Sequence, residues 1–277
     1  MNWKVNRRTF LQITGMTALA AGLGYRFRQR MLESGSLQVA SMTTFKMGTL
    51  INFQLVTEDL EQGNLDIANV IQILDAMIFN LDHRQAGSPL WRLNQTGEIL
   101  SPPRDLVEVL TLAERISQKT DGALDVTVKP ALDLYKENQN VPPQVMQLVD
   151  YRLLDISEHI ISLPDPGMAV TLDGIAKGWI VDQVSAKFSS LGYTSTLVEA
   201  GGDLYLDGKS AGMDAWRVGL RHPRDQHQNT FSGQDLGLAT SGDDQHAFSE
   251  DFTHHHILDP RLGFSPRELS SVTVSAP

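Results

Sequence analysis

The stretch VTLDGIAKGWIVDQV, from Val170 to Val184, changes its hydrophobic pattern half-way. Apolar and polar side chains alternate at its start, which predicts a strand over Val170–Leu172. From Ile175 onward the apolar residues fall near one stripe of a helix. Between the two patterns, Asp173 is a suitable helix N-cap, and Gly174 allows a sharp backbone turn. We therefore expect a strand, a tight turn and a helix in direct succession.

Such a turn can bind an anion. Its backbone N–H groups and the positive end of the helix dipole point outward, where a phosphate group can lie. Lys177, in the first turn of the expected helix, adds a positive charge at the same place. An ordinary strand–helix connection with a solvated lysine has the same local pattern. The residues of this stretch leave both interpretations open.

Other short strings accompany this stretch in a fixed order along the chain. They are MGT (47–49), GALDVTVKPALDLY (122–135), LVEAGGDLYLDG (197–208), LATSGDDQHAF (238–248) and HHHILDPRLG (254–263). Together these strings resemble the FAD:protein FMN transferase family, which is also called ApbE-like. The resemblance extends from about Met47 to the last residue. It implies the α+β fold of these flavin transferases, with mixed or antiparallel sheets and packed helices.

The hydrophobic spacing along the rest of the chain also favours an α+β fold, because hairpin signals are mixed with few helices. Helices are predicted over 57–81, with Thr57 as the N-cap, over 104–119 and over 145–152. Residues 82–96 and 137–143 are predicted to be loops. Strands are predicted over 36–56 with a break at 46–49, and over 156–161, 168–172, 193–199, 216–220, 237–240 and 257–258.

The resemblance implies a set of contacts to FAD. The residues at the matching positions are Met47, Ser88, Leu124, Asp125, Thr171, Asp173, Lys177 and Leu258. Judged by residue type alone, Met47 is equally suited to packing at a strand bend, and Asp125 to a turn. The chain also departs from the family pattern, since Pro89 stands where an acid is frequent and Leu124 where an aromatic residue is usual.

The resemblance further implies a magnesium ion, with the backbone carbonyl of Gly174 as one ligand. Magnesium prefers hard oxygen ligands in octahedral geometry. Many members have Asp-Leu where this chain has Thr171-Leu172, which moves the carboxylate to Asp173. In the family, a helix with an Asp and a Thr follows the last strand and completes the magnesium site. Because the sequence stops at SVTVSAP (271–277), we expect the domain over 36–277 to be truncated at its C-terminus.

The implied reaction moves FMN from FAD to a serine or threonine hydroxyl of an acceptor protein and releases AMP. A hydroxyl is a weak nucleophile and needs a base, a role that the resemblance gives to His256. Either Asp243 or Asp259 is a candidate for the carboxylate that orients this histidine. A zinc site at His254–His256 is disfavoured, because successive residues of a strand point to opposite faces.

Other functions use the same site. An FAD pyrophosphatase would transfer the flavin phosphate to water, and a non-catalytic flavin-binding protein would transfer nothing. Turnover with an acceptor protein separates the transferase from both. For the transferase, the expected partner is a membrane redox subunit or a secreted flavoprotein.

The first 35 residues differ from the rest in composition. Arg7 and Arg8 belong to a twin-arginine pattern, and the apolar run that follows ends at Tyr25, which is short for a membrane span. We predict a twin-arginine signal or anchor over 1–35 and a periplasmic or membrane-associated domain. The chain has no cysteine, which excludes thiol chemistry and lipid attachment through cysteine. Its net charge is -10 although the leader is basic, so the domain is acidic and unsuited to nucleic acids.

Overall fold

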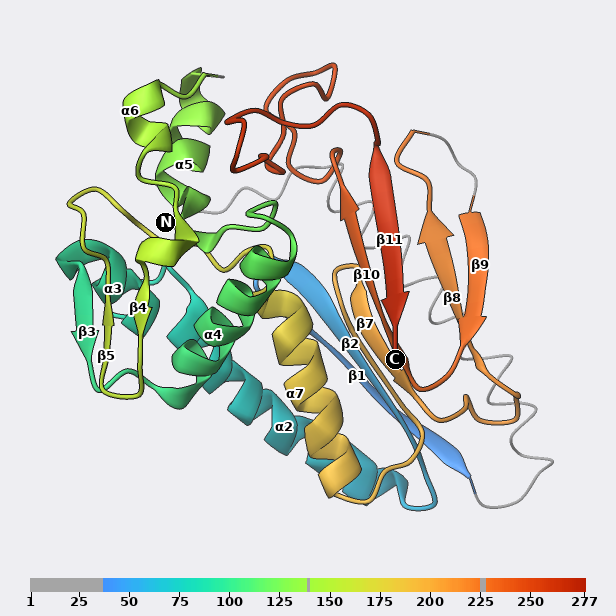
Figure 1. Ribbon diagram of the computed structural model, residues 1–277. Helices are drawn as coiled ribbons and strands as arrows, with labels where there is room; N and C mark the ends of the chain where they lie inside the picture. Colours follow the sequence, from blue (N-terminus) through green and yellow to red (C-terminus); the bar gives the residue numbers. More distant parts are fainter. Residues whose placement is uncertain (1–36, 139, 225–227) are drawn as a thin grey trace.

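The structure, a computed structural model, describes residues 37–138, 140–224 and 228–277, so the predicted leader lies outside the described residues. A six-stranded antiparallel sheet dominates it, with the strand order β1-β2-β6-β7-β10-β11 (Figure 1). The strands are β1 (Gln38–Lys46), β2 (Thr49–Thr57), β6 (Thr196–Ala200), β7 (Asp203–Asp207), β10 (Leu236–Gly242) and β11 (Ser271–Ala276). With helices packed against this sheet, the fold is α+β, as predicted.

The first hairpin confirms the predicted break at 46–49. Lys46 pairs with Thr49, so only Met47 and Gly48 form the turn. Both have positive φ, 51° and 73°, and such two-residue turns match the twist of the flanking strands. The turn is therefore tight, and it contains no residue beyond these two.

Helices α2 (Leu60–Leu81) and α7 (Ala176–Ser190) lie against the sheet, and α4 (Arg104–Lys119) packs against α2. Their apolar stripes form the main core with the inward side chains of β2. The bounds of α4 are those predicted. The predicted N-cap of α2 is wrong, because Thr57 still belongs to β2. Asp59 caps the helix instead, and its carboxylate accepts a hydrogen bond from Gln62 N at 3.0 Å.

The predicted loop over 82–96 contains helix α3 (Pro89–Thr96), which the sequence analysis missed. Ser88 caps α3 by accepting a hydrogen bond from Trp91 N at 3.0 Å. Pro89 occupies the first turn, where a missing N–H costs nothing. The helix is short and largely polar, so its apolar spacing is too brief to be recognised. Next to it lies a small sheet of β3 (Glu98–Leu100), β5 (Ile160–Ser162) and β4 (Asp155–Ile156).

Two predicted strands do not form. Residues 168–172 and 257–258 belong to no strand. In the first, Val170 N donates to Asn94 Oδ1 at 2.7 Å, and Asn94 Nδ2 donates to Val170 O at 2.8 Å. Thr171 N donates to Val126 O at 2.9 Å. A side-chain amide and a loop thus satisfy the backbone that the alternating pattern assigned to a sheet.

The segment between α4 and α7 forms a satellite unit of short helices. These are the 3-10 helix η1 (Val126–Val128), α5 (Lys129–Asn138), α6 (Pro143–Met146) and the 3-10 helix η2 (Tyr151–Leu153). The single helix predicted over 145–152 is therefore wrong. Tyr135 and Ala131 of α5 pack with Leu258 in a separate small core. Through this core, the segment 254–266 packs against helix α5.

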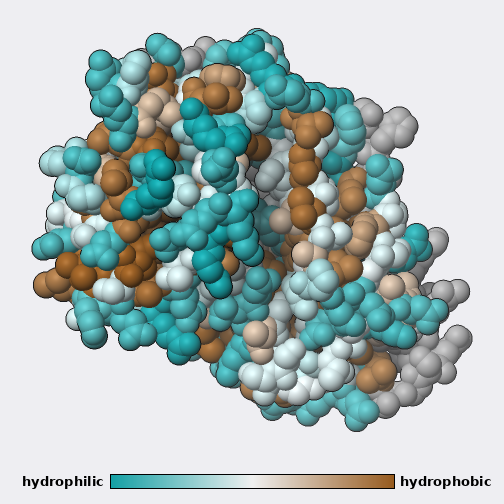
Figure 2. All heavy atoms as spheres, viewed as in Figure 1, coloured by the Kyte–Doolittle hydropathy of each residue, from teal (hydrophilic) through white to brown (hydrophobic). Residues whose placement is uncertain are grey.

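Hairpin β8 (Trp216–Arg221) and β9 (Gln228–Gly233) forms its own two-stranded sheet beside β10 and β11 (Figure 1). Strand β11 lies at the edge of the main sheet, with 43% of Val272 and 59% of Val274 exposed. Figure 2 shows the corresponding column of hydrophobic residues at the position of β11. No helix within the described part of the chain is long and apolar enough to cross a membrane.

Candidate functional site

Four of the short strings meet around the first turn of α7. Lys177 Nζ donates to the carbonyl of Gly201 at 3.0 Å, which joins AKG to the β6–β7 turn. A β-carbon at Gly201 would lie only 2.5 Å from Thr49 Oγ1 of the MGT hairpin. The backbone of Thr240, in the TSG string, donates to the Asp203 carboxylate. Strings that are far apart in the sequence therefore meet at one site, where side chains of one string contact the backbone of another.

Lys177 has partners of its own in this site. Its Nζ lies 3.4 Å from Asp203 Oδ2, and 29% of its side chain is exposed. Burial raises the pKa of Asp203, although the lysine charge lowers it in part. The lysine is therefore not simply solvated. It is fixed at the turn between two oxygens and keeps an exposed side from which a ligand can reach it.

Asp173 does not cap α7. The residue at the N-cap position is Ile175, and no side chain caps the helix there. The Asp173 carboxylate instead accepts a hydrogen bond from Arg84 Nη2 and lies 3.5 Å from His83 Nε2. Burial raises the pKa of Asp173, but His83 and Arg84 outweigh it and hold the pKa well below its usual range. The carboxylate is therefore ionised at neutral pH and is already bound to cationic or polar partners.

Gly174 lies exposed at the turn, and a β-carbon at this position would meet Leu124 Cδ1 at 3.5 Å. One backbone carbonyl is not a magnesium site, since magnesium also requires carboxylate, phosphate or water oxygens. The neighbouring carboxylate, Asp173, is occupied by Arg84. Within residues 37–138, 140–224 and 228–277, no three His, Asp or Glu side chains are placed to hold a metal ion. The described residues alone do not fit a magnesium site.

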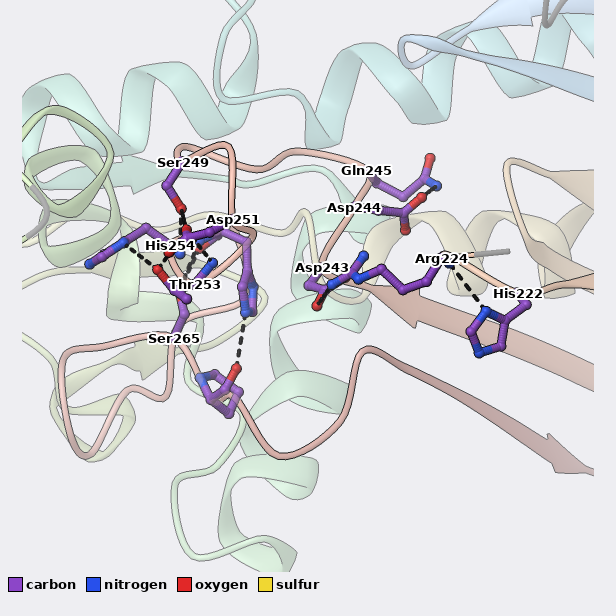
Figure 3. Close-up of polar contacts among 12 residues, drawn as sticks. His222, Arg224, Asp243, Asp244, Gln245, Ser249, Asp251, Thr253, His254 and Ser265 are labelled. Carbon is purple, nitrogen blue, oxygen red and sulfur yellow. Dashed lines mark hydrogen bonds and ion pairs between the residues drawn. The ribbon is translucent and has the colours of Figure 1, made fainter. Parts of the chain in front are cut away.

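The three consecutive histidines lie in a loop, not in the predicted strand, and each has different neighbours. Figure 3 shows His254 beside Thr253 in this loop. The His254 ring lies against Tyr135, with ring centroids 5.7 Å apart. His255 is buried, and its Nε2 donates to the carbonyl of Pro266 at 3.0 Å. The simple alternation of faces expected for a strand therefore does not apply to these side chains.

His256 is the histidine of the three that lies against His246. Its backbone N donates to the carbonyl of His246 at 3.0 Å, and the two rings meet edge to face with centroids 5.2 Å apart. Its Nδ1 is buried and has no hydrogen-bond partner among the described residues. Burial, together with His246 and His255, lowers the pKa of His256 to about 4, while Asp173 acts in the opposite direction. The ring is therefore neutral at pH 7 and can accept a proton.

The two carboxylates considered as partners of His256 are bound to arginines. Asp243 Oδ2 lies 2.5 Å from Arg224 Nη2, and Asp259 Oδ2 lies 2.7 Å from Arg261 Nη2. The acidic side chain whose charge acts on His256 is Asp173. The turn before α7 and the histidine loop thus interact electrostatically, because the charge of Asp173 acts on His256.

The side chains of the remaining predicted FAD contacts pack against, or form hydrogen bonds with, other residues of the protein. Asp125 is buried, which raises its pKa, and its oxygens accept hydrogen bonds from Thr127 N at 2.8 Å and Tyr151 N at 2.9 Å. This is the turn role that its residue type suggested. Met47 packs against the main core, and Ser88 caps α3. Thr171 is buried, with its Oγ1 3.3 Å from Asp173 N, and Leu258 is buried beside α5.

His83, Arg84 and His246 were not predicted as site residues. The first two lie in a segment predicted to be a polar loop in which only Ser88 was given a role, and Arg84 is 89 residues from Asp173. His246 stands in the TSG string but was given no role. Pairing between residues so far apart in the sequence leaves no signal in hydrophobic period or turn chemistry. The Asp-Gly pair at 173–174 predicted a turn before the helix, but it did not predict the residues that pair with Asp173.

Comparison with known proteins agrees with these features. The model of the ApbE family matches residues 47–277. The chain belongs to the ApbE family. A FAD:protein FMN transferase of Haemophilus influenzae is 28% identical over 288 residues, covering 96% of this chain and 82% of that protein. One of Vibrio cholerae is 30% identical over 234 residues, covering 78% of this chain and 70% of that protein.

Solved ApbE structures have the same fold. The structure of the flavin transferase ApbE from Vibrio cholerae superposes with a TM-score of 0.75 at 26% identity, covering 87% of this chain and 82% of that chain. ApbE from Pseudomonas stutzeri, in its apo form, gives 0.75 at 25% identity, covering 87% and 80%. The ApbE resemblance predicted from the short strings is confirmed.

Proposed function

We propose that this ApbE protein transfers FMN from FAD to a serine or threonine hydroxyl of an acceptor protein and releases AMP. The observation that carries the proposal is the convergence of four strings, MGT (47–49), AKG (176–178), GGD (201–203) and TSG (240–242), at one turn. The charge of Asp173, at the same turn, acts on His256. The names of the relatives support a flavin transferase, and the hydroxyl acceptor is what the family resemblance implies, with which a neutral histidine at the site is compatible.

The proposed step is a phosphoryl substitution. The acceptor oxygen forms a bond to the FMN phosphorus, and the bond from that phosphorus to the bridging oxygen breaks, so AMP leaves with the bond electrons. The hydroxyl proton moves to His256, which is neutral at pH 7 because of its lowered pKa. In this proposal, Lys177 and the N–H groups at the start of α7 stabilise the negative charge of the diphosphate.

Lys177→Ala is expected to weaken FAD binding about tenfold to a hundredfold, as for the loss of a charge-assisted phosphate contact of roughly 1.5–3 kcal/mol. The same change also removes the charge that offsets the buried Asp203. Titration of the flavin fluorescence measures the affinity. Lys187→Ala, an exposed lysine in the last turn of the same helix, is the control and should bind FAD normally. Equal affinity of both variants would exclude a phosphate contact.

The reaction is tested by incubating the full chain with FAD, added magnesium and a threonine-containing acceptor peptide. A gain of one FMN unit in the peptide mass, together with AMP, is the expected result. Release of AMP and FMN without acceptor would identify a pyrophosphatase, and tight FAD binding without either product would identify a flavin carrier. Omission of magnesium tests whether the ion is required, which the residues of this chain do not establish by themselves.

We also propose that the protein is exported by the twin-arginine route and acts in the periplasm or at the membrane. The support is the Arg7-Arg8 pattern and the short apolar run after it. An acceptor with a flavinylated Ser or Thr, such as a membrane redox subunit or a secreted flavoprotein, would be found there. Fractionation of cells that express the full chain checks this, and a purely cytoplasmic protein would contradict it.

A further inference from the structure

We propose that Arg224 is a positioning residue for the transfer reaction, because it fixes the loop that carries His256 through Asp243 and Phe252. This inference rests on the proposed function for its catalytic consequence. Its structural part concerns three segments that are separate in sequence, namely the segment that follows strand β8, the turn after β10 and the histidine loop.

One guanidinium group joins these segments. Arg224 Nη2 lies 2.5 Å from Asp243 Oδ2, and its Cζ lies 4.1 Å from the centre of the Phe252 ring. Figure 3 shows the arginine side chain pointing at Asp243 from the His222 side. A planar guanidinium can hold a carboxylate and stack on an aromatic ring at the same time, which an ammonium group cannot do equally well.

The carboxylate depends on this arginine. Only 9% of the Asp243 side chain is exposed, and its Oδ1 is buried with no hydrogen-bond partner among the described residues. The Arg224 side chain is 35% exposed, but its removal leaves a nearly buried carboxylate without its ion-pair partner, which costs free energy. Loss of Arg224 should therefore push Asp243 toward water and displace the turn that contains it.

The displacement would reach His256 through a short connection. Asp243 begins the turn that leads to His246, and the carbonyl of His246 accepts the hydrogen bond from His256 N at 3.0 Å. Phe252 lies on the other side of the loop, four residues before His256, and has a positive φ of 61°. Arg224 thus holds the loop on both sides of its contact with His246.

The chain offers a matched control. Arg221, at the end of β8, pairs with Asp244 at 2.5 Å, one residue from Asp243. The Arg221 side chain is 51% exposed, compared with 35% for Arg224, and Asp244 is nearly as buried as Asp243, at 13% against 9%. The two arginines have the same charge, leave the same hairpin and pair with neighbouring carboxylates, so they differ chiefly in the contact of Arg224 with Phe252.

The test compares Arg224→Gln, Arg224→Lys and Arg221→Gln. Arg224→Gln should lower kcat for flavin transfer about tenfold or more with FAD affinity within about twofold of wild type, as expected for a group that matters in the transition state. Arg224→Lys should recover part of the loss, because it keeps the ion pair. Arg221→Gln should match wild type. Equal kcat in Arg224→Gln and Arg221→Gln would overturn the proposal.

A second measurement needs neither FAD nor an acceptor. The pKa of His256, followed by NMR of its ring proton, should rise in Arg224→Gln from about 4 toward the ordinary histidine value, because a displaced loop lets water reach the ring. An unchanged pKa of His256 in a folded Arg224→Gln protein would contradict positioning, even if kcat fell. If wild type performs no transfer, the proposed function fails, and this pKa comparison still decides the role of Arg224.

Discussion

His256→Asn is expected to lower the rate of flavin transfer by about a hundredfold or more while FAD affinity is nearly unchanged, since general-base catalysis contributes about 10²–10⁴-fold. His256 is neutral at pH 7, which is the form in which an imidazole can take the proton of the attacking hydroxyl. Asparagine keeps a polar side chain of similar reach but cannot accept this proton. The mass gain of the acceptor peptide under single-turnover conditions measures the loss.

His254→Asn is the control for this substitution. The His254 ring lies against Tyr135, and its Nδ1 is 3.0 Å from Thr253 Oγ1, so it has a packing role. We expect a small change in rate. If His254→Asn abolished transfer while His256→Asn did not, the base would be wrongly assigned.

The pH dependence follows from the lowered pKa of His256. The base acts in its neutral form, and with a pKa of about 4 it stays neutral as the pH falls from 8 to about 5. The kcat/KM for transfer should therefore be flat over that range and fall only at more acidic pH. Acid should also destabilise the fold, because the unfolded chain binds this proton at about pH 6.5 and the folded chain only near 4. Stability contributed by the neutral ring is therefore lost as the pH drops through this interval.

Tyr135→Ala is expected to cost about 3–5 kcal/mol of unfolding free energy, the usual range for deleting a buried aromatic ring. Tyr135 is 1% exposed, and its ring contacts those of Phe248 and His254 at 6.4 and 5.7 Å between centroids. Its Oη accepts a hydrogen bond from Ser265 N at 3.2 Å. A cavity at this position would separate α5 from both ends of the histidine loop. Chemical denaturation measures the loss.

Two controls separate the roles of Tyr135. Tyr135→Phe keeps the ring but leaves the buried Ser265 N–H without this acceptor, so it should cost about 1–3 kcal/mol. Phe188→Ala makes a similar cavity in the main core, away from the histidine loop. Under conditions where both alanine variants stay folded, Tyr135→Ala should lose transfer activity and Phe188→Ala should keep more of it. A stability change below about 1 kcal/mol for Tyr135→Ala would contradict the packing described for α5.

Local patterns predicted the elements whose own residues decide them. The bounds of α4 followed from its apolar stripe, and the β1–β2 hairpin followed from two apolar strands around a Gly turn. Helix α3 was missed because its signal is a cap and a proline followed by few apolar residues. The stretch 168–172 alternates like a strand, but Asn94 and Val126 satisfy its backbone, and neither is near it in sequence.

The sequence by itself determined the α+β class, the ApbE strings and the residues available for chemistry, because motifs, turns and hydrophobic periods are local properties of the chain. The tertiary structure alone decided what those residues contact. In the folded chain, Asp173 pairs with Arg84 and His83, and Asp243 pairs with Arg224. Lys177 contacts Gly201 and Asp203. It also set the protonation state of His256, since that depends on burial and on neighbouring charges from other segments. Pairings and desolvation arise only when distant segments fold together, and no local pattern encodes them.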